Sequence, residues 1–367
     1  MKILFSAYNF TTKIYLESVA KVYSVTVFQN SKSALEKPHG VKVIKVDHGF
    51  QCKLPFDRFL NANRVRPEYI LSFKKVFPAT KVDVLVAVEF YNLTFYQFLK
   101  YKRKHDVSKL HLWSETKDWP KFFFVRWIMY AFWWYFKRNL KHVEKVFVFT
   151  NEGKAFFNTY APELEVEVFP PPIDLQLFSK DSNKEYLPSG KLRIIINARY
   201  TSRKRYEDLF MAVNILKQKG ILTAVTCIGR PEEGKLLYKK KVQDMGLETV
   251  VSFVDTISSP KKLRDLYQKN DVLVLPSDRE AIGMVVPEAM ACGLATITSD
   301  AVGANTYVEE GKTGFIFETR NVLQLASYLE ELTKSGETER MGKWAAEVVQ
   351  QKYTVDVLGQ RFTQALE

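Results

Sequence analysis

The chain has 367 residues, of which 46% are hydrophobic, and it carries 54 Lys and Arg against 41 Asp and Glu, a formal net charge of +13. This length predicts two domains, and the hydrophobic content is sufficient for two buried cores. The three cysteines, Cys52, Cys227 and Cys292, contain no C-x-x-C pair, which argues against a disulfide scaffold or a zinc site and for a reducing compartment.

The positive charge is concentrated in the first half of the chain. Residues 1–175 hold 27 Lys and Arg against 16 Asp and Glu, a balance of +11, and the remainder is nearly neutral at +2. A basic half is typical of proteins that bind nucleic acid, an anionic membrane surface or an acidic substrate. Composition alone leaves all three open.

The first half alternates strand-like and helix-like segments. The N-terminal segment 2–8 reads as a strand rather than a signal peptide, because charge returns at Lys13. A helical pattern follows at 11–23, and further strand-like segments lie at 24–29, 41–46, 82–88, 109–113 and 143–150. Such alternation predicts a parallel sheet with helices on both faces.

Residues 121–142 are unusually aromatic and basic. The uncharged stretch from Trp127 to Phe136 is too short to cross a bilayer, for which a helix needs about 20 apolar residues. A cationic flank on an aromatic helix suits the membrane interface, and the alternative is a core helix under the first sheet, which periodicity cannot distinguish.

Further basic residues favour the membrane over the core. Four cations precede the aromatic segment at Lys100, Lys102, Arg103 and Lys104. We therefore expect a cytoplasmic protein that lies peripherally on the inner face of the membrane, and no nucleic-acid partner, because no nucleic-acid motif is present. The expected contact residues are Lys121, Arg126, Trp127, Trp133, Trp134, Lys137 and Arg138.

The second half begins after the segment 166–174, whose three prolines predict an extended linker. A buried strand at 191–197 leads into a basic loop with Arg199, Arg203, Lys204 and Arg205. Four cations at one strand end predict a pyrophosphate clamp, and the alternative is a basic surface loop.

Two glutamates mark the most informative stretch, residues 271–317. An apolar strand ends at Ser277, a loop carries Glu280 and Gly283, and Glu288 falls in the first turns of the next helix. In open α/β sheets ligands bind at this edge, where a helix N-terminus offers N–H groups to phosphate and a carboxylate can accept hydrogen bonds from a ribose. The alternative is an exposed loop acid and a second acid that merely suits the helix dipole.

More than forty consecutive residues of this stretch, from D-V-L-V-L-P-S to E-E-G-K-T-G-F-I-F, resemble the donor-site signature of the retaining GT-B glycosyltransferases of family 4, the glycosyl transferases group 1. The resemblance implies an α/β fold of the GT-B type. Its two Rossmann-like, doubly wound domains face a central cleft, and a C-terminal helix crosses back to the first domain. The expected domains are 1–175 with 352–367, facing the acceptor and membrane, and 176–351, holding a nucleotide-sugar donor.

The resemblance also assigns roles to single residues. Glu280, Lys204 and Arg199 are the expected catalytic residues, with Lys204 and Arg199 on the diphosphate and Glu280 at the donor sugar. The loop departs from the family pattern by having Ala198 and Arg205 where glycines are usual. The other expected donor-binding residues are Glu288, on the ribose, and Gly283, Met284, Val285, Arg203, Gly229 and Arg230.

The first half departs further from the family. The loop after the first strand, residues 8–12, has no glycine, and the usual histidine near the donor sugar is not evident, because His111 falls inside a strand. We expect His111 to be structural. Asn9 and Glu115 are the candidates for acceptor contact.

The resemblance thus implies a hexosyltransferase-type glycosyltransferase without a cofactor, and it alone implies that the enzyme is retaining. No aspartate pair with metal spacing is evident, so we expect it to be metal-independent. It would move a sugar from a UDP- or GDP-linked donor to a lipid-linked or surface-glycan acceptor at the membrane face. A nucleotide-sugar epimerase with the same fold, and a non-catalytic basic protein that binds membrane or nucleic acid, are the alternatives.

Overall fold

The computed structural model describes residues 1–5, 10–30, 36–46, 82–91, 93–105, 107, 109–119, 123–187, 190–229 and 233–367. The chain divides into two compact units. The first contains Met1–Pro172 and Val355–Glu367, and the second contains Ile173–Thr354. From the sequence we placed the same divisions at 175/176 and 351/352.

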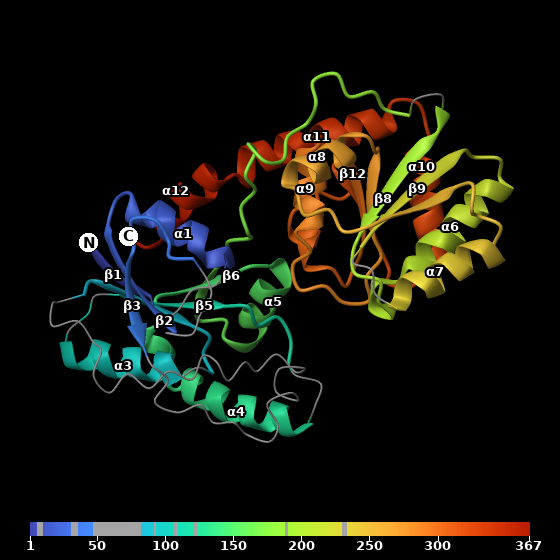
Figure 1. The fold of residues 1–367 in the computed structure, drawn as a ribbon. Helices are drawn as coiled ribbons and strands as arrows, with labels where there is room; N and C mark the ends of the chain where they lie inside the picture. Colours follow the sequence, from blue (N-terminus) through green and yellow to red (C-terminus); the bar gives the residue numbers. More distant parts are fainter. Residues whose placement is uncertain are drawn as a thin grey trace. The chain divides into compact units, whose positions relative to one another are not determined.

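Among the described residues, seven parallel strands form the sheet of the first unit (Figure 1). The central strands are buried along their length apart from Lys109 at the start of the fifth strand, as expected for a sheet covered on both faces. In spatial order the strands are β3 (Lys42–Val46), β2 (Ser24–Asn30), β1 (Lys2–Phe5), β4 (Val84–Val88), β5 (Lys109–Ser114), β6 (Lys145–Val148) and β7 (Glu165–Val168).

Helices cover both faces of this sheet. On one face α3 (Leu93–His105), α4 (Phe123–Lys137) and α5 (Asn151–Tyr160) share a core with β4, β5 and β6. On the other, α1 (Phe10–Ala20) packs against the last helix, α12 (Val355–Ala365). The Phe362 ring of α12 lies 5.0 Å from the ring of Trp113 in β5. The expected return of the C-terminal helix to the first domain is therefore confirmed.

The expected linker at 166–174 is partly wrong. Residues 166–168 belong to β7, which pairs in parallel with β6. Only the segment from Phe169 onward leaves the sheet, because proline lacks the N–H group that a strand interior needs. The three prolines therefore follow the edge strand β7, and the linker begins after that strand and not at residue 166.

The second unit contains six parallel strands in its described residues. Their order is β10 (Val251–Val254), β9 (Thr223–Ile228), β8 (Leu192–Asn197), β11 (Val272–Leu275), β12 (Ala295–Ser299) and β13 (Gly314–Phe317). The helices are α6 (Tyr206–Gln218), α7 (Glu233–Asp244), α8 (Pro260–Gln268), α9 (Val285–Ala291), α10 (Val322–Glu331) and α11 (Glu337–Lys352).

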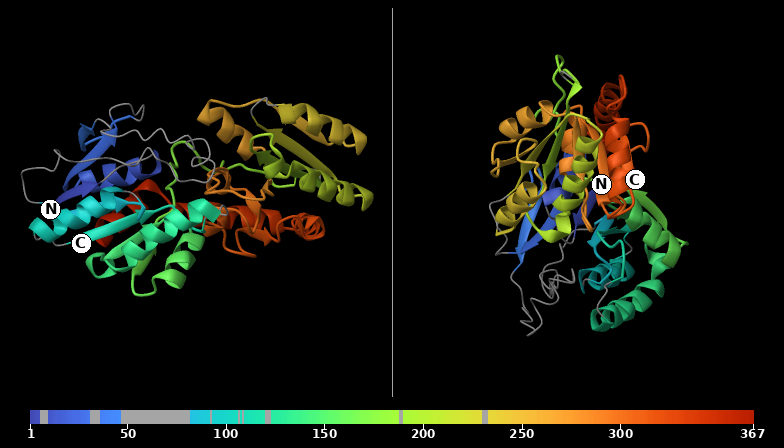
Figure 2. Two further views of the ribbon diagram at one scale, coloured as in Figure 1. Left: turned by 90° about the horizontal axis from the view of Figure 1, so that it is seen from below. Right: turned by 90° about the vertical axis from the view of Figure 1, so that its right-hand side faces the viewer.

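Two separate cores hold these helices on opposite faces of the second sheet. Side chains of α6, α7 and α10 fill one core, and side chains of α8, α9 and α11 fill the other (Figures 1 and 2). The strand order reverses between β8 and β11, as it does between β1 and β4 in the first sheet. Each unit is thus doubly wound, as expected, and the carboxyl ends of these strands form the edge at which sheets of this kind usually bind ligands.

Candidate functional site

The loops that follow β8 and β11 lie side by side at the carboxyl edge of the second sheet. The backbone N–H of Asp278, after β11, donates to the carbonyl oxygen of Arg203, after β8, at 2.9 Å. This bond joins the basic loop to the glutamate loop. The two motifs that the sequence singled out therefore form one site.

Lys204 is the cation at the centre of this site. It ends a short 3-10 turn, Ser202–Lys204, is buried, and its ammonium forms an ion pair with the carboxylate of Glu280. Burial, with the charges of Arg203 and Arg199, lowers the pKa of Lys204 to about 8, and the neighbouring carboxylate opposes this fall. Arg199 and Arg203 are themselves exposed, so three cations converge here and one of them is desolvated.

Glu280 is held through its backbone on both sides. Its N–H donates to the carbonyl of Ala301 at 3.1 Å, and its own carbonyl accepts from the N–H of Gly303 at 3.1 Å. Both partners follow β12, so Glu280 bridges two neighbouring strand ends. Its carboxylate is thereby fixed at the edge of the sheet beside Lys204.

Gly283 makes the turn between Glu280 and α9 possible. Its φ is +83°, and a Cβ at this position would lie 3.2 Å from the Glu280 Cγ and 3.2 Å from the Leu275 Cδ2. A side chain here would therefore strain the backbone and displace the glutamate. Met284 and Val285 follow at the start of α9, where N–H groups have no partner within the helix and can face an anion.

Glu288 lies one turn into α9 and is largely buried. Burial raises the pKa of Glu288 to about 7, and a hydrogen bond lowers it in part. That bond comes from the hydroxyl of Tyr267 on α8, at 3.4 Å, and the Tyr267 oxygen in turn accepts from the side-chain amide of Asn197 at 2.9 Å. Tyr267 and Asn197 orient Glu288, and sequence reasoning missed both, because no motif links them to it.

Arg205 explains one departure from the family pattern. Its φ of +53° and ψ of +42° are left-handed, a conformation that glycine adopts easily and arginine rarely. The guanidinium makes two hydrogen bonds to the buried carboxylate of Asp208, at 3.0 and 2.6 Å. Arg205 is thus engaged in holding the start of α6, and Arg199, Arg203 and Lys204 carry the charge of the site.

Gly229 lies at the end of β9, where close packing leaves no room for a side chain. A Cβ there would come within 2.4 Å of the Ala198 carbonyl oxygen and 2.9 Å of the Tyr200 ring. The glycine is needed for close packing of the loop after β8 whether or not a ligand binds. Arg230, expected beside it, lies outside the described residues.

The first unit has an unexpected acid at the corresponding edge. Glu89 follows β4, is buried, and adopts a φ of +62°, which is strained for any residue but glycine. Its carboxylate accepts from the Ser114 hydroxyl and the Glu115 N–H, both at 2.6 Å, and from the Thr116 hydroxyl at 3.2 Å. Burial, and to a lesser extent the charge of Glu115, raises the pKa of Glu89 to about 7.

Glu89 therefore ties the end of β4 to the loop that follows β5. A lone acid directly after a buried strand could have predicted this residue, and we did not use that signal. Of the two acceptor candidates, Glu115 is exposed beside Glu89, and Asn9 lies outside the described residues. His111 is buried within β5, its ring 5.3 Å from that of Phe147, where it has the structural place we expected.

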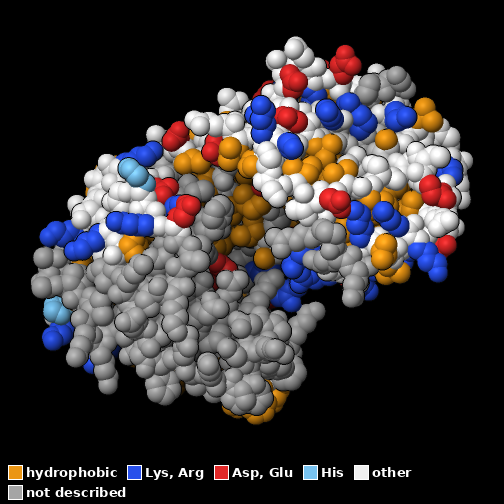
Figure 3. Space-filling view, viewed as in Figure 1, with side chains coloured by type: hydrophobic (Ala, Val, Ile, Leu, Met, Phe, Trp, Pro, Cys, Tyr) orange, Lys and Arg blue, Asp and Glu red, His pale blue; other side chains and the backbone are white. Residues whose placement is uncertain are grey.

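Helix α4 has one buried side and one exposed aromatic side. Met129, Trp133 and Phe136 are buried in the first core. The opposite side, here called the α4 face, is exposed and consists of Phe124, Trp127, Ile128, Trp134 and Tyr135. Trp127 and Ile128 follow Phe124 by three and four residues, and Trp134 and Tyr135 follow these by seven, so all five lie along one stripe. In Figure 3, hydrophobic side chains emerge at the lower margin of the molecule, where Figure 1 has α4.

Cations flank the α4 face. Arg126, Lys137 and Arg138 are exposed, and the Arg138 guanidinium lies 4.3 Å above the ring of Trp134. Trp133, which we expected at the membrane, is instead buried and 5.0 Å from the Phe90 ring, because it lies on the same side of the helix as Met129 and Phe136. Lys121 falls outside the described residues.

Two kinds of feature were sought in the part of the chain that the structure describes, a membrane-spanning helix and a metal site. No helix there is both long and apolar enough to span a bilayer. Nor does that part contain a group of three or more His, Cys, Asp or Glu side chains placed to hold a metal ion.

Known proteins share this sequence pattern. Residues 178–348 match the family model described as glycosyl transferases group 1. A D-inositol 3-phosphate glycosyltransferase of Paenarthrobacter aurescens is 26% identical over 205 residues, which cover 53% of this chain and 50% of the relative. The chain thus spans about half the length of the curated relatives it matches.

Solved structures share the whole fold. The sucrose-phosphate synthase of Thermosynechococcus elongatus superposes with a TM-score of 0.70 at 17% identity, covering 99% of this chain and 97% of the other. The Anabaena protein HepE, in complex with UDP, gives 0.69 at 18% identity, covering 100% and 99%. At these identities the likeness shows the fold, and the expected GT-B architecture is confirmed.

Proposed function

We propose that this chain is a glycosyltransferase of group 1, the family whose model residues 178–348 match, and that it transfers a sugar from a nucleotide-sugar donor to an acceptor at a membrane surface. The observation that carries the proposal is the joined loops of the second unit. They bring Lys204, Glu280 and Glu288 to one edge of one sheet.

The donor would lie along this edge. Arg199, Arg203 and Lys204 would hold its diphosphate together with the N–H groups at the start of α9, since fixed cations and helix N-termini both favour phosphate. Glu288, oriented by Tyr267, would accept hydrogen bonds from the ribose. HepE, which shares the fold, has been solved with UDP, and this supports a uridine nucleotide.

Glu280 would act at the reacting carbon. Its ion pair with Lys204 holds an acid next to a cation, so a bound donor would have its sugar near the first and its diphosphate near the second. As the glycosidic bond breaks, positive charge grows on the anomeric carbon and negative charge on the leaving diphosphate. Both groups then stabilise the transition state more than the ground state.

Two finer features follow the family resemblance. We propose that the anomeric configuration of the donor is retained, which proton NMR of the first-formed product tests. We also propose that no divalent cation is required, because three protein cations already face the leaving group. Loss of activity in EDTA, restored by Mg²⁺ or Mn²⁺, would contradict this second proposal.

The acceptor would be lipid-linked, or a surface glycan, presented at the cytoplasmic face of the membrane. The α4 face supports this placement, because tryptophan and tyrosine settle at headgroup depth when cations flank them. The +11 balance of residues 1–175 also suits the anionic leaflet that faces the cytoplasm. The proposed docking uses Trp127, Trp134, Arg126, Lys137 and Arg138.

A panel of UDP-, GDP- and ADP-sugars tests the donor site directly. A specific donor at about 100 times its Kd adds roughly 2.7 kcal/mol to stability, which thermal unfolding detects. Glu288→Gln and Lys204→Gln should each abolish the shift, whereas Lys191→Gln, an exposed lysine just before β8, should leave it intact. Stabilisation that survives both site variants would place the nucleotide elsewhere.

Acceptor dependence separates transfer from epimerisation. A transferase releases nucleoside diphosphate faster when acceptor lipid or glycan is added, whereas an epimerase converts its donor without one. No donor binding at all, with vesicle binding retained, would leave a non-catalytic membrane protein and refute the enzymatic proposal.

A further inference from the structure

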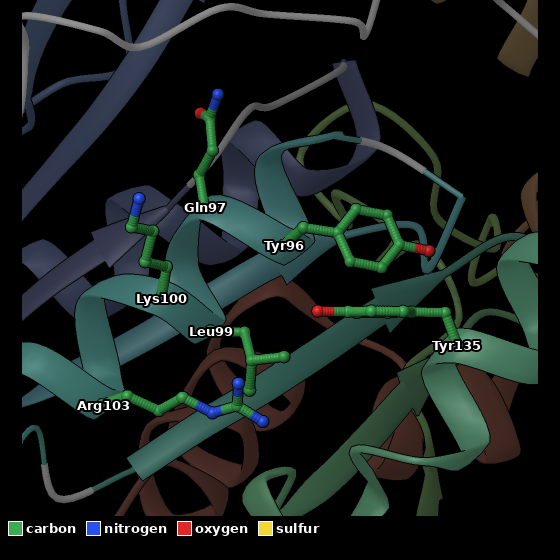
Figure 4. A pocket seen from close by; sticks show the side chains of 6 residues that line it. All are labelled: Tyr96, Gln97, Leu99, Lys100, Arg103 and Tyr135. Atoms are coloured by element: carbon green, nitrogen blue, oxygen red, sulfur yellow. The ribbon is translucent and has the colours of Figure 1, made fainter.

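A pocket lies between α3 and α4 on the first unit (Figure 4). Its volume is about 510 Å³, and its lining residues are Tyr96, Gln97, Leu99, Lys100 and Arg103 of α3 and Tyr135 of α4. This volume exceeds what a bare phosphate ion needs and falls within the range of small-molecule sites. The pocket plays no part in the donor site, which belongs to the other unit.

The wall of the pocket is fixed by contacts between the two helices. The Tyr96 hydroxyl donates to the Phe90 carbonyl at 2.9 Å, and its ring meets the Tyr135 ring edge-on, with centroids 4.9 Å apart. Figure 4 shows the Tyr135 hydroxyl directed from α4 toward the side chain of Leu99 on α3. Tyrosine therefore supplies both rigidity and a polar group to the pocket.

Arg103 is oriented but not neutralised. Its guanidinium donates to the side-chain oxygen of Asn139 at 2.6 Å, and the Asn139 amide donates to the Tyr135 carbonyl at 2.7 Å. No carboxylate among the described residues lies within ion-pair distance of Arg103 or Lys100, whereas Lys102 on the same helix pairs with Glu144 at 3.4 Å. Two positive charges at the pocket thus lack a counter-charge in this part of the chain.

Two further details bear on the occupant. The side-chain oxygen of Gln97 is buried, has no donor among the described residues, and is an acceptor, so it suits a hydroxyl group that a headgroup carries beside its phosphate and not the phosphate itself. Burial, together with the charges of Arg103 and Lys141, lowers the pKa of His142 next to the pocket, so this histidine stays neutral at neutral pH and still leaves the region positive.

The pocket is continuous with the α4 face through Tyr135, which belongs to both. We propose that the pocket binds the phosphate-bearing headgroup of an anionic phospholipid while the α4 face rests in the same leaflet. This inference builds on the docking described under the proposed function. Arginine suits a phosphate because its planar fork donates two parallel hydrogen bonds, and lysine at the rim adds a mobile charge. A zwitterionic headgroup would place its own positive charge beside Lys100 and Arg103, which would repel it.

Vesicle sedimentation tests the inference with a matched pair of variants. Lys100→Gln and Lys104→Gln remove the same charge from exposed positions one turn apart on α3, and only Lys100 lines the pocket. Any lysine near an anionic surface contributes about 1 kcal/mol, roughly fivefold. We expect Lys104→Gln to weaken binding to phosphatidylglycerol vesicles by no more than this factor, and Lys100→Gln and Arg103→Gln by 10-fold to 30-fold.

Two further variants separate the pocket from folding defects. Arg103→Lys keeps the charge and loses the fork, so its affinity should fall between those of the wild type and Arg103→Gln. Tyr135→Phe keeps the ring on the α4 face and loses only the hydroxyl, and it should weaken binding to phosphatidylglycerol but not to phosphatidylcholine. Equal losses for Lys100→Gln and Lys104→Gln would mean general attraction by surface charge, and the pocket inference would be wrong.

Soluble ligands distinguish a lipid headgroup from free phosphate as the occupant of the pocket. They also allow the pocket to be tested separately from the docking proposal. Glycerol phosphate should compete with vesicles for the wild type, and inorganic phosphate should compete more weakly. If no vesicle binds at all, the docking proposal fails. Calorimetric titration with glycerol phosphate then decides the pocket alone, since binding that Lys100→Gln abolishes supports an anion site and no binding overturns it.

Discussion

Replacing both exposed tryptophans of the α4 face is the most direct test of membrane docking. Trp127 and Trp134 leave 65% and 60% of their surface exposed. A tryptophan side chain buries about 200 Å² when fully covered, so each could transfer about 120 Å² out of water. At about 25 cal/mol per Å² this gives ~3 kcal/mol for the full burial of each tryptophan. At headgroup depth each contributes about half of that, because one side of the ring stays hydrated.

The Trp127→Ser and Trp134→Ser double variant should therefore lose ~3 kcal/mol of vesicle binding, about 150-fold in the partition coefficient. Trp134→Ser also removes the ring under Arg138, a further small loss. Folding should be nearly unaffected, because substitutions at exposed positions usually change stability by about 0.5 kcal/mol or less.

Sedimentation with vesicles of mixed phosphatidylglycerol and phosphatidylcholine measures the loss. The matched control is Trp344→Ser, which removes a 40% exposed tryptophan on α11 in the other unit and should leave binding unchanged. The tryptophan contribution should also persist at 0.5 M salt, where attraction between exposed charges is screened. Double-variant binding within twofold of the wild type would show that the α4 face does not enter the membrane.

Glu280→Ala should lower kcat on the order of 10²–10³-fold with a smaller change in donor Kd, because the carboxylate acts mainly on charge that develops in the transition state; turnover at the wild-type rate would remove Glu280 from the mechanism. Arg205→Gly should destabilise the second unit by about 2–4 kcal/mol in urea unfolding, because relief of about 1 kcal/mol of left-handed strain is smaller than the cost of leaving the buried Asp208 carboxylate unpaired; a more stable variant would contradict this balance. Glu89→Gln should flatten the pH dependence of thermal stability: burial raises the folded-state pKa of Glu89 from 4.5 to about 7, so its favourable contribution is complete below pH 4.5 and is lost as pH rises toward 7. Wild-type and Glu89→Gln melting curves that shift in parallel from pH 5 to 8 would assign that titration to another group.

The sequence was sufficient to predict that the basic loop and the glutamate loop lie together, because each loop follows a buried strand of the same sheet. A buried strand followed by a loop puts that loop at the carboxyl edge of a parallel sheet, and two such loops on neighbouring strands must then meet. The family resemblance predicted that Lys204 and Glu280 share one site, and the pairing of β8 with β11 is the physical reason that they do. It could not reveal Tyr267, which reaches Glu288 from a helix on one face of the sheet.

Departures from the family pattern were visible but not interpretable from the sequence. Arginine in place of glycine at position 205 gave no indication that the backbone keeps the left-handed turn. The turn survives because Asp208, three residues later, holds the guanidinium, and that compensation depends on α6 burying the carboxylate. A substitution that changes the side chain can thus leave the loop path of the site unaltered.

The aromatic segment shows why periodicity could not choose between a core helix and a membrane helix. Apolar residues occur all around α4, so neither stripe stands out. The core interpretation is correct for the buried side, and the membrane interpretation stays a prediction for the exposed side. Trp133 and Trp134 are neighbours in sequence, but adjacent helical residues point about 100° apart around the axis, and here that turn separates a buried side chain from an exposed one. Packing against Phe90 and Phe157 shows that Trp133 is the tryptophan buried in the core. Trp134 stays exposed, where we propose that it contacts a bilayer.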